Sequence, residues 1–325
     1  MTQLRKMSNI VPLANGGGTR MKVSETVLNH NPWQGGRNRW ITLLGLLLCS
    51  LAISASAQVV VSAPTGMVQI SAGTTQVWAT DINGNTYQYI PSKNKLKKVP
   101  GVLQQISVGA GKSVWGVIDG VTWTYNFTAK TWDDIATPEP FTWIAAGGQG
   151  VWAVNASTGH IFSYDQTTGT FNPPPHGEPS ESFNSVYVGS YEIGVWGLDN
   201  AGNAWLYNSN TEYFDKTDGV LVQIAVGTGQ VWGITSIDTV WMYDVGTQKW
   251  IQPQPSAGLG VISAGNNANI WGIAPGSPGT LWNWNGSAWV EQPEDEGLFA
   301  VSVSSGKAGV FAIGDSGTVY KYNEM

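Results

Sequence analysis

The residues best suited to bind a ligand form part of a recurring aromatic pair, in which a second aromatic residue follows the first by two positions. Tryptophan takes the first place of this pair at four positions, Trp123, Trp205, Trp241 and Trp282. A partly exposed aromatic ring can hold the C–H face of a sugar or an O-methyl group, while amides and hydroxyls bind the polar groups. We expect three amides to take that second part, those of Gln105, Gln223 and Asn184.

The sequence gives no support for catalytic or metal chemistry. Cys49 is the only cysteine, and beyond residue 57 there are two histidines, His160 and His176, with no second ligand-type residue at the spacing of a metal site. No Gly-x-Ser-x-Gly sequence marks a serine nucleophile. We therefore expect no catalytic residue, no metal site and no cofactor, and we predict that the protein is not an enzyme.

Two short segments imitate known ligand loops. Residues 109–113 read Gly-Ala-Gly-Lys-Ser, but a phosphate loop requires glycine where Ile106 stands and a helix afterwards. Residues 81–85 read Asp-Ile-Asn-Gly-Asn, which is too short for a twelve-residue calcium loop and lacks its closing glutamate. Because Asn, Asp and Gly tolerate the backbone angles of tight turns, we interpret both segments as turns.

The aromatic pairs belong to a unit that occurs seven times after residue 57. Each copy contains a triplet similar to Val-Trp-Gly, whose aromatic residues lie 36 to 44 positions apart: Trp78, Trp115, Trp152, Trp196, Trp232, Trp271 and Phe311. An apolar residue opens each copy and glycine follows it six positions later, except that Ser305 takes this place in the seventh copy. A fixed period of this length indicates a repeat architecture.

Within each copy the residues alternate with a period of two, which is typical of strands. The fifth copy predicts strands at 222–226, 231–234, 240–243 and 249–252, separated by turn residues. Four antiparallel strands repeated seven times predict an all-β, seven-bladed β-propeller. The first strand usually carries a small residue at its centre, as a crowded central axis requires, but Tyr187 breaks this rule, so we expect a wider or filled channel there.

The two ends of the repeat region are predicted to complete one blade. The seventh copy stops after its third strand, whereas residues 58–64 precede the first copy as a fourth strand would. We expect 59–61 to pair with 320–322 as the outer strand of the last blade, which closes the ring and leaves no unpaired first strand. Closure also makes 58–325 one domain.

Residues 1–57 have the pattern of an export signal. Arg37 and Arg39 precede an apolar run at 41–53, and Ala-Ser-Ala at 55–57 follows it, in the order of a cleaved signal peptide. The run is short for a membrane span, which needs about 20 residues. We predict a leader over 1–57, a secreted or periplasmic protein, and no membrane span after cleavage; an uncleaved anchor is the alternative.

Removal of this leader would leave an acidic chain. Ten lysines, no arginine and 21 acidic residues remain after residue 57, a net charge of −11. Nucleic acids and anionic membranes bind basic surfaces, so we exclude both as partners and expect a monomer. The one basic cluster, at 93–98, falls in a loop and an outer strand, where it would discourage the addition of another strand.

The triplet, the aromatic pair and the tryptophan that closes many copies together resemble the tectonin repeat over all of 58–325. The resemblance implies a propeller lectin that binds glycans, some of them O-methylated, at sites between blades. The best-known tectonin lectins have six blades, whereas this chain has seven copies of the unit.

Three functions fit these observations. The first is a secreted lectin with several weak, similar glycan sites, whose combined avidity can exceed that of one site by about 10² to 10⁴. The second is a non-catalytic scaffold that binds a protein or peptide on one face of the ring, and the third, less favoured, is a glycan lyase or hydrolase built on the propeller. Repeated clefts would favour the lectin, and one contiguous apolar patch would favour the scaffold.

Overall fold

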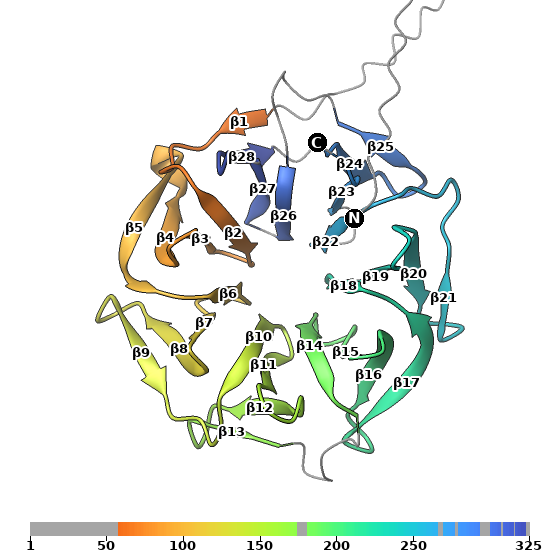
Figure 1. The fold of residues 1–325 in the computed structure, drawn as a ribbon, viewed down its shortest axis with the longest axis horizontal. Coiled ribbons are helices and arrows are strands. Elements are labelled where there is room, and N and C mark those ends of the chain that lie inside the picture. Colours follow the sequence, from red (N-terminus) through yellow and green to blue (C-terminus); the bar gives the residue numbers. More distant parts are fainter. Residues whose placement is uncertain are drawn as a thin grey trace, which may run out of the picture. The chain divides into compact units, whose positions relative to one another are not determined.

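Seven four-stranded antiparallel sheets stand around a central axis, as the ribbon of Figure 1 shows. This computed structural model describes residues 58–173, 181–265, 269–276, 279–292, 300–306, 308–314 and 316–322, which belong to the compact unit formed by 52–325. The predicted seven-bladed β-propeller is therefore confirmed. The predicted leader lies outside the described residues, so its cleavage stays a prediction.

The first four blades each consist of four consecutive strands. Blade 1 contains β2 (Met67–Ala72), β3 (Val77–Asp81), β4 (Asn85–Ile90) and β5 (Lys95–Val102). Blade 2 contains β6 (Gln105–Val108), β7 (Val114–Ile118), β8 (Val121–Asn126) and β9 (Thr131–Ile135). Blade 3 contains β10 (Phe141–Gly147), β11 (Gly150–Asn155), β12 (Ile161–Asp165) and β13 (Thr170–Asn172). Blade 4 contains β14 (Phe183–Val188), β15 (Val195–Asp199), β16 (Asn203–Asn208) and β17 (Tyr213–Val220).

The remaining three blades follow the same plan. Blade 5 contains β18 (Gln223–Val226), β19 (Val231–Ile234), β20 (Val240–Asp244) and β21 (Lys249–Ile251), each within one residue of its predicted bounds. Blade 6 contains β22 (Val261–Ala264), β23 (Ile270–Ile273), β24 (Leu281–Trp284) and β25 (Trp289–Glu291). Blade 7 contains β26 (Ala300–Gly306), β27 (Gly309–Gly314), β28 (Val319–Tyr322) and β1 (Gln58–Val60). A short 3-10 turn, η1 (Pro91–Lys93), precedes β5, and no helix within the described ranges is long and apolar enough to cross a membrane.

The N-terminal strand closes the ring as predicted. In blade 7, β1 is the outer strand and pairs with β28, so that Val59 lies opposite Lys321 and Val60 opposite Tyr320. The next residue, Val61, donates its N–H to Val319 and is buried in the core between blades 7 and 1. Because the first and last blades each depend on the other, the repeats cannot form an open stack.

The aromatic residue of each triplet packs against the aromatic residues of the following blade. Trp78 of blade 1 lies 4.6 Å from Tyr125 and 5.4 Å from Trp132 of blade 2, measured between ring centroids. The arrangement recurs around the ring, from Trp196 to Tyr243 at 4.7 Å and from Phe311 of blade 7 to Tyr89 of blade 1 at 5.0 Å. Edge-on contacts of this kind are favourable beyond the burial of area alone. The core is therefore divided among the seven blade interfaces.

Glycines mark two places where the chain comes too close for a side chain. In the triplets, a Cβ on Gly233 would lie 2.5 Å from Leu221 Cδ1, so the glycine makes room for the apolar residue that opens the copy. A glycine also stands at the end of each first strand. In blade 1 this is Gly73, where a Cβ would lie 2.2 Å from the carbonyl oxygen of Gly109 in the next blade. The prediction for the seventh copy is wrong by one position: Gly306, not Ser305, reaches the neighbouring blade, because its Cβ would lie 2.4 Å from Ala72 O.

Two buried aspartates hold the turns between the second and third strands of blades 1 and 4. The two carboxylate oxygens of Asp199 accept bonds from the Ala201 and Asn203 N–H groups, the Asn203 amide, and Trp205 Nε1 at 3.0 Å. Asp81 is bound in the same way, with the Tyr87 hydroxyl in place of the indole. Burial alone would raise the pKa of each carboxyl, but these hydrogen bonds outweigh it and hold the pKa below its ordinary value of 3.8. The segment at 81–85 is thus a turn, as interpreted from the sequence.

We predict that Asp199→Asn destabilises the fold more than Asp81→Asn does. In either variant, the new side-chain amide directs an N–H group toward the donors that the carboxylate accepts from in the wild type. In blade 1 the Tyr87 hydroxyl can rotate and accept a bond from this N–H, whereas in blade 4 Trp205 Nε1 can only donate. Asp199→Asn should lower the free energy of unfolding by about 1 kcal/mol more than Asp81→Asn does, which is the value of one ordinary hydrogen bond. Urea unfolding of both variants at neutral pH measures it, and equal losses would contradict the assignment.

The pH dependence supplies a second check. A carboxyl whose folded-state pKa is lowered stabilises the protein above its unfolded pKa, about 4, and loses that contribution as the pH falls through the folded value. The stability gap between the wild type and Asp199→Asn should therefore narrow below about pH 4. A gap that stays constant down to acid unfolding would show that the charge of Asp199 plays no part.

Candidate functional site

The four predicted tryptophans occupy equivalent positions between blades. Each lies on the third strand of its blade, opposite the glycine of the triplet, as in the pair of Trp123 with Gly116 and that of Trp241 with Gly233. All four are half-buried and pack in the clusters between their own and the preceding blade, with the apolar residue that opens the copy as a neighbour. The structure thus confirms their place between blades, and their part in sugar binding stays a prediction.

The polar edge of these indoles is mostly turned inward. Trp205 Nε1 donates to Asp199, and Trp282 Nε1 donates to Thr280 Oγ1 at 2.8 Å. The Nε1 atoms of Trp123 and Trp241 are buried without a hydrogen-bond partner among the described residues. Lys216 also holds its ammonium 5.8 Å from the Trp205 ring centroid, a cation–π distance. Any sugar contact at these residues would therefore use the ring rather than its N–H.

The two predicted glutamines connect neighbouring blades. The Gln105 amide donates to Ile144 O at 3.1 Å and accepts from Ile144 N at 2.8 Å, so it pairs with blade 3 as a peptide group would. Gln223 makes the same two bonds to Ile262 of blade 6, both at 3.1 Å. These bonds satisfy the inner edge of a sheet whose first strand has no strand beyond it. A sugar-binding role for either glutamine stays a prediction and would have to use the remaining N–H and lone pair.

We predict that Gln105→Ala lowers the unfolding free energy by about 1–3 kcal/mol, because it leaves the N–H and carbonyl of Ile144 without partners. The adjacent Gln104 is the matched control, since its bonds to Asp119 are exposed. Gln104→Ala should change stability by less than about 0.5 kcal/mol. Urea unfolding measures both, and equal effects would contradict the bridging role of Gln105.

Asn184 lies in a cleft where blade 4 leads into blade 5. The cleft has a volume of about 320 Å³ and is lined by the turn after β15, the chain between β17 and β18, and the turn after β19. The Asn184 amide donates to Asp199 O at 3.2 Å and accepts from Ser185 Oγ at 2.7 Å, which leaves it one N–H and one lone pair. Asn200 and Ser236 are exposed in the same cleft, and Val220 and Val222 contribute aliphatic side chains that are 62% and 58% exposed. Apolar and hydrogen-bonding groups therefore stand side by side on an accessible surface.

This cleft was only partly predictable. Asn184 was predicted, but the valines, Asn200 and Ser236 were not, because nothing in their local pattern separates them from ordinary turn residues. The corresponding turn of blade 1 shows the same backbone plan: Leu103 N donates to Gly84 O, as Leu221 N donates to Gly202 O. There the exposed side chains are mainly aliphatic, with Val68, Ile82 and Val102 between 44% and 74% exposed. The clefts thus share a frame and differ in lining.

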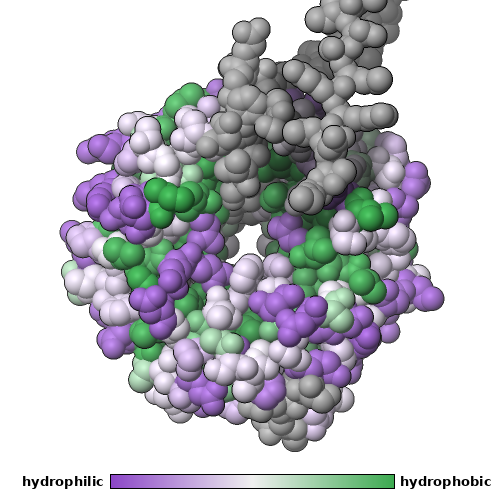
Figure 2. All heavy atoms as spheres, viewed as in Figure 1, coloured by the Kyte–Doolittle hydropathy of each residue, from purple (hydrophilic) through white to green (hydrophobic). Residues whose placement is uncertain are grey.

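A channel runs along the axis of the ring, and Figure 2 shows its opening at the centre of the molecule. One part, of about 290 Å³, is lined by the first strands, including Gln69, Ser71, Trp143 and Tyr187. A second part, of about 490 Å³, is lined largely by backbone at the glycine end of these strands and shares several residues with the first. Tyr187 therefore lines the channel, and the expected widening or filling at this residue stays a prediction.

The described lining of the channel carries no charge, and the charged groups lie outside it. Among the described residues, every side chain that lines the smaller part of the channel is uncharged. Over the described ranges, no three His, Cys, Asp or Glu side chains are grouped to hold a metal ion. The lysines of the basic cluster at 93–98 lie exposed on η1 and β5, the outer strand of blade 1, where they were predicted. His176 lies outside the described residues.

Comparison with known proteins supports the repeat assignment. A family model of the Tectonin domain matches the chain twice, over residues 66–213 and 118–257, which together include blades 1 to 5. No curated protein matches the chain.

Solved structures of similar fold have diverse functions. YCF48 bound to D1 peptide is 13% identical, with a TM-score of 0.62 over 85% of this chain and 99% of that one. Virginiamycin B lyase from Staphylococcus aureus is 12% identical, with a TM-score of 0.61 over 83% and 99%. U3-55K is 8% identical, with a TM-score of 0.62 over 83% and 100%. At such identities the likeness shows the propeller fold alone.

Proposed function

Because this chain belongs to the tectonin domain family, we propose that it is a carbohydrate-binding protein with several weak, similar sites between its blades. The proposal includes export by the leader at 1–57, a monomeric ring and the absence of catalysis. Its ligands are glycans, among them O-methylated ones, rather than nucleic acids or membranes.

The observation that carries this proposal is the cleft between blades 4 and 5. An O-methyl sugar presents methyl groups beside hydroxyls, and the cleft presents Val220 and Val222 beside the amides of Asn184 and Asn200. Removing about one CH₂ from water is worth about 0.8 kcal/mol, so two valines can discriminate a methylated sugar from its parent. Trp241, on the third strand of blade 5, packs in the cluster that also contains Leu221 of the cleft lining.

A shallow cleft of this size binds one sugar weakly. The backbone bond that frames the cleft repeats around the ring, since the N–H of the residue that opens a copy donates to the turn of the preceding blade at Leu103, Phe141, Phe183, Leu221 and Leu259. Clefts built on this frame face the same way and can engage a glycan-covered surface together. A second binding event on such a surface is effectively intramolecular and raises the avidity without any new contact. Weak single sites are therefore compatible with useful binding.

We expect residues 58–325 to bind methylated glycans on an array, and Val220→Thr with Val222→Thr to weaken this binding. Threonine has nearly the shape of valine but replaces a methyl with a hydroxyl, so the affinity for a methylated monosaccharide should fall roughly three- to tenfold. Calorimetry with the single sugar measures this without avidity.

Val245→Thr is the matched control, because Val245 is 56% exposed but lies in the turn between β20 and β21, away from the cleft. It should leave the affinity unchanged. Absence of array binding, or equal loss in both variants, would overturn the lectin assignment for this cleft.

One observation favours the scaffold as a second candidate. Val68, Ile82 and Val102 are exposed around the turn of blade 1. YCF48, a protein of similar fold, has been solved with a bound peptide. Ile82→Asp should lower the affinity for a peptide that binds at this surface, whereas the affinity for a glycan in the cleft between blades 4 and 5 should not change.

A further inference from the structure

Aromatic residues stand at two of the first-strand positions that line the channel. The position of Gln69 is filled by Gln105 in blade 2, Ser185 in blade 4, Gln223 in blade 5, Val261 in blade 6 and Ser302 in blade 7, but by Trp143 in blade 3, as the strand registers show. Two residues further along, the position of Ser71 is filled by serine or alanine in the other described blades but by Tyr187 in blade 4. Both exceptions fall on neighbouring blades.

Trp143 makes one of the two bonds between blades that a glutamine makes at this position. Trp143 Nε1 donates to Val186 O at 2.7 Å, which is the bond that Gln105 Nε2 makes to Ile144 O. Burial raises the pKa of Tyr187, although hydrogen bonds with Ser185 and the backbone of Ile224 oppose this rise. Since a glutamine can supply the bridging bond between blades, that bond does not explain an indole at position 143.

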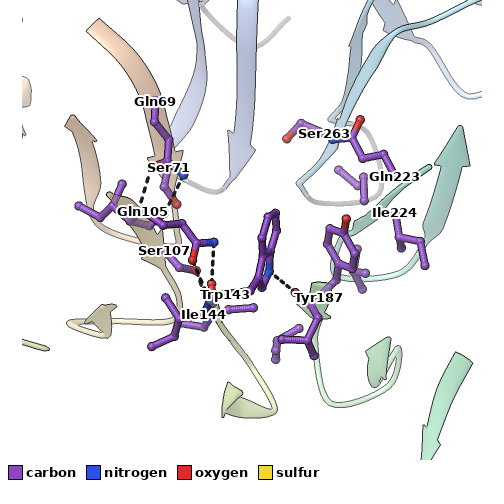
Figure 3. Close-up of a pocket in the computed structure, with 18 of the residues that line it drawn as sticks. Gln69, Ser71, Gln105, Ser107, Trp143, Ile144, Tyr187, Gln223, Ile224 and Ser263 are labelled. Atoms are coloured by element: carbon purple, nitrogen blue, oxygen red, sulfur yellow. Dashed lines mark hydrogen bonds between the residues drawn. The ribbon is translucent and has the colours of Figure 1, made fainter. Parts of the chain in front are cut away.

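What the aromatic residues add is a surface inside the channel. Their ring centroids lie 5.9 Å apart at an angle of 59°, and both side chains are half-buried and line the narrower cavity. Figure 3 shows the two rings side by side, with Gln105 and Ser107 on one flank and Gln223 and Ser263 on the other. The channel thus has an aromatic wall and flanking polar walls.

The polar walls retain hydrogen-bonding capacity. Ser71 and Ser107 each accept one backbone N–H, from Val108 and Ala146, so each hydroxyl proton can still be donated. Each bridging glutamine uses one N–H and one carbonyl lone pair in its bonds to the next blade and retains another of each. A purely aromatic ligand would leave these groups dehydrated and unpaired, which opposes its binding.

We propose that the channel is a second ligand site, which binds one neutral pyranose against Trp143 and Tyr187. A pyranose matches both kinds of wall, because its C–H face stacks on aromatic rings and its hydroxyls bond to serine and glutamine. The uncharged lining selects against an acidic or basic sugar, since a charge buried without a partner is costly. The cavity of about 290 Å³ is at the lower end for ligand pockets, which suits one ring rather than a chain.

The site is distinct from the clefts between blades. It occurs once on the axis and depends on residues that differ from the repeat, whereas the clefts depend on the turns and linking chains. It also adjoins the wider cavity at the glycine end, where the turn after β14 carries Tyr191, which is 83% exposed. This end provides a route for the ligand from solvent.

Two variants distinguish the contribution of the Trp143 ring to ligand binding from the contribution of its hydrogen bond to stability. Trp143→Gln introduces the residue of the equivalent positions in blades 1, 2 and 5 and can keep a bond to Val186, so it should fold and should bind methyl β-glucoside or methyl β-galactoside at least tenfold more weakly. Trp143→Phe keeps a ring and loses the bond, so it should be less stable and bind within about threefold of wild type. Calorimetry and thermal unfolding measure the two properties.

Fluorine NMR of wild-type protein labelled with 5-fluorotryptophan gives a readout that does not depend on the folding of Trp143→Gln. The Trp143 resonance, identified by its loss in Trp143→Phe, should shift with either glycoside and not with methyl glucuronide. No shift at about 10 mM, where a millimolar site is mostly occupied, would overturn the proposal, as would equal binding by wild type and Trp143→Gln. The double variant Val220→Thr, Val222→Thr should retain the shift, so failure of the cleft and failure of the channel are distinguishable.

Discussion

The ring depends on the contact between the triplet aromatic residue of one blade and the aromatic residues of the next. Trp232, for example, is fully buried between Trp284 and Trp289 of blade 6, with centroid distances of 5.4 and 5.6 Å. An aromatic side chain buries about 150–250 Å² in such a place, and a blade has no other partner against which to bury it. Every blade therefore needs a neighbour on both sides, and only a closed ring gives the first and last blades theirs.

A second constraint acts at the centre of the ring. The first strand of each sheet has no strand beyond it, so half of its backbone groups would face the channel unpaired. Glutamine amides at Gln69, Gln105 and Gln223 satisfy some of these groups from the preceding blade, with N···O distances of 2.8–3.3 Å. This explains why the channel is polar but uncharged, because an amide offers both a donor and an acceptor where a charged group offers only one.

Packing and function consequently draw on different residues. Positions that recur in every copy, such as the triplet aromatics and the glycines at the ends of the first strands, are used by the interfaces between blades. Residues that differ between copies are free to create individual surfaces, and both sites described above are built from them: Asn184 and Val220 in one cleft, and Trp143 and Tyr187 in the channel. In a repeat protein of this kind, departures from the repeat are better guides to ligands than the repeat itself.

The spacing of the repeats by itself determined the fold. A triplet every 36 to 44 residues, strand periodicity and a seventh copy lacking its fourth strand were sufficient for the blade count and for the closing strand, because these depend on local patterns and on chain length. The sequence also singled out Tyr187 as an exception within the channel. Tertiary structure decided which atoms are available: the amides of Gln105 and Gln223 each spend one N–H and one carbonyl lone pair on Ile144 and Ile262, which leaves one of each for a ligand. The cleft of Asn184 and the meeting of Trp143 with Tyr187 were decided there too, because contacts across blades join residues about 40 positions apart, and no local pattern records which atoms are already bonded.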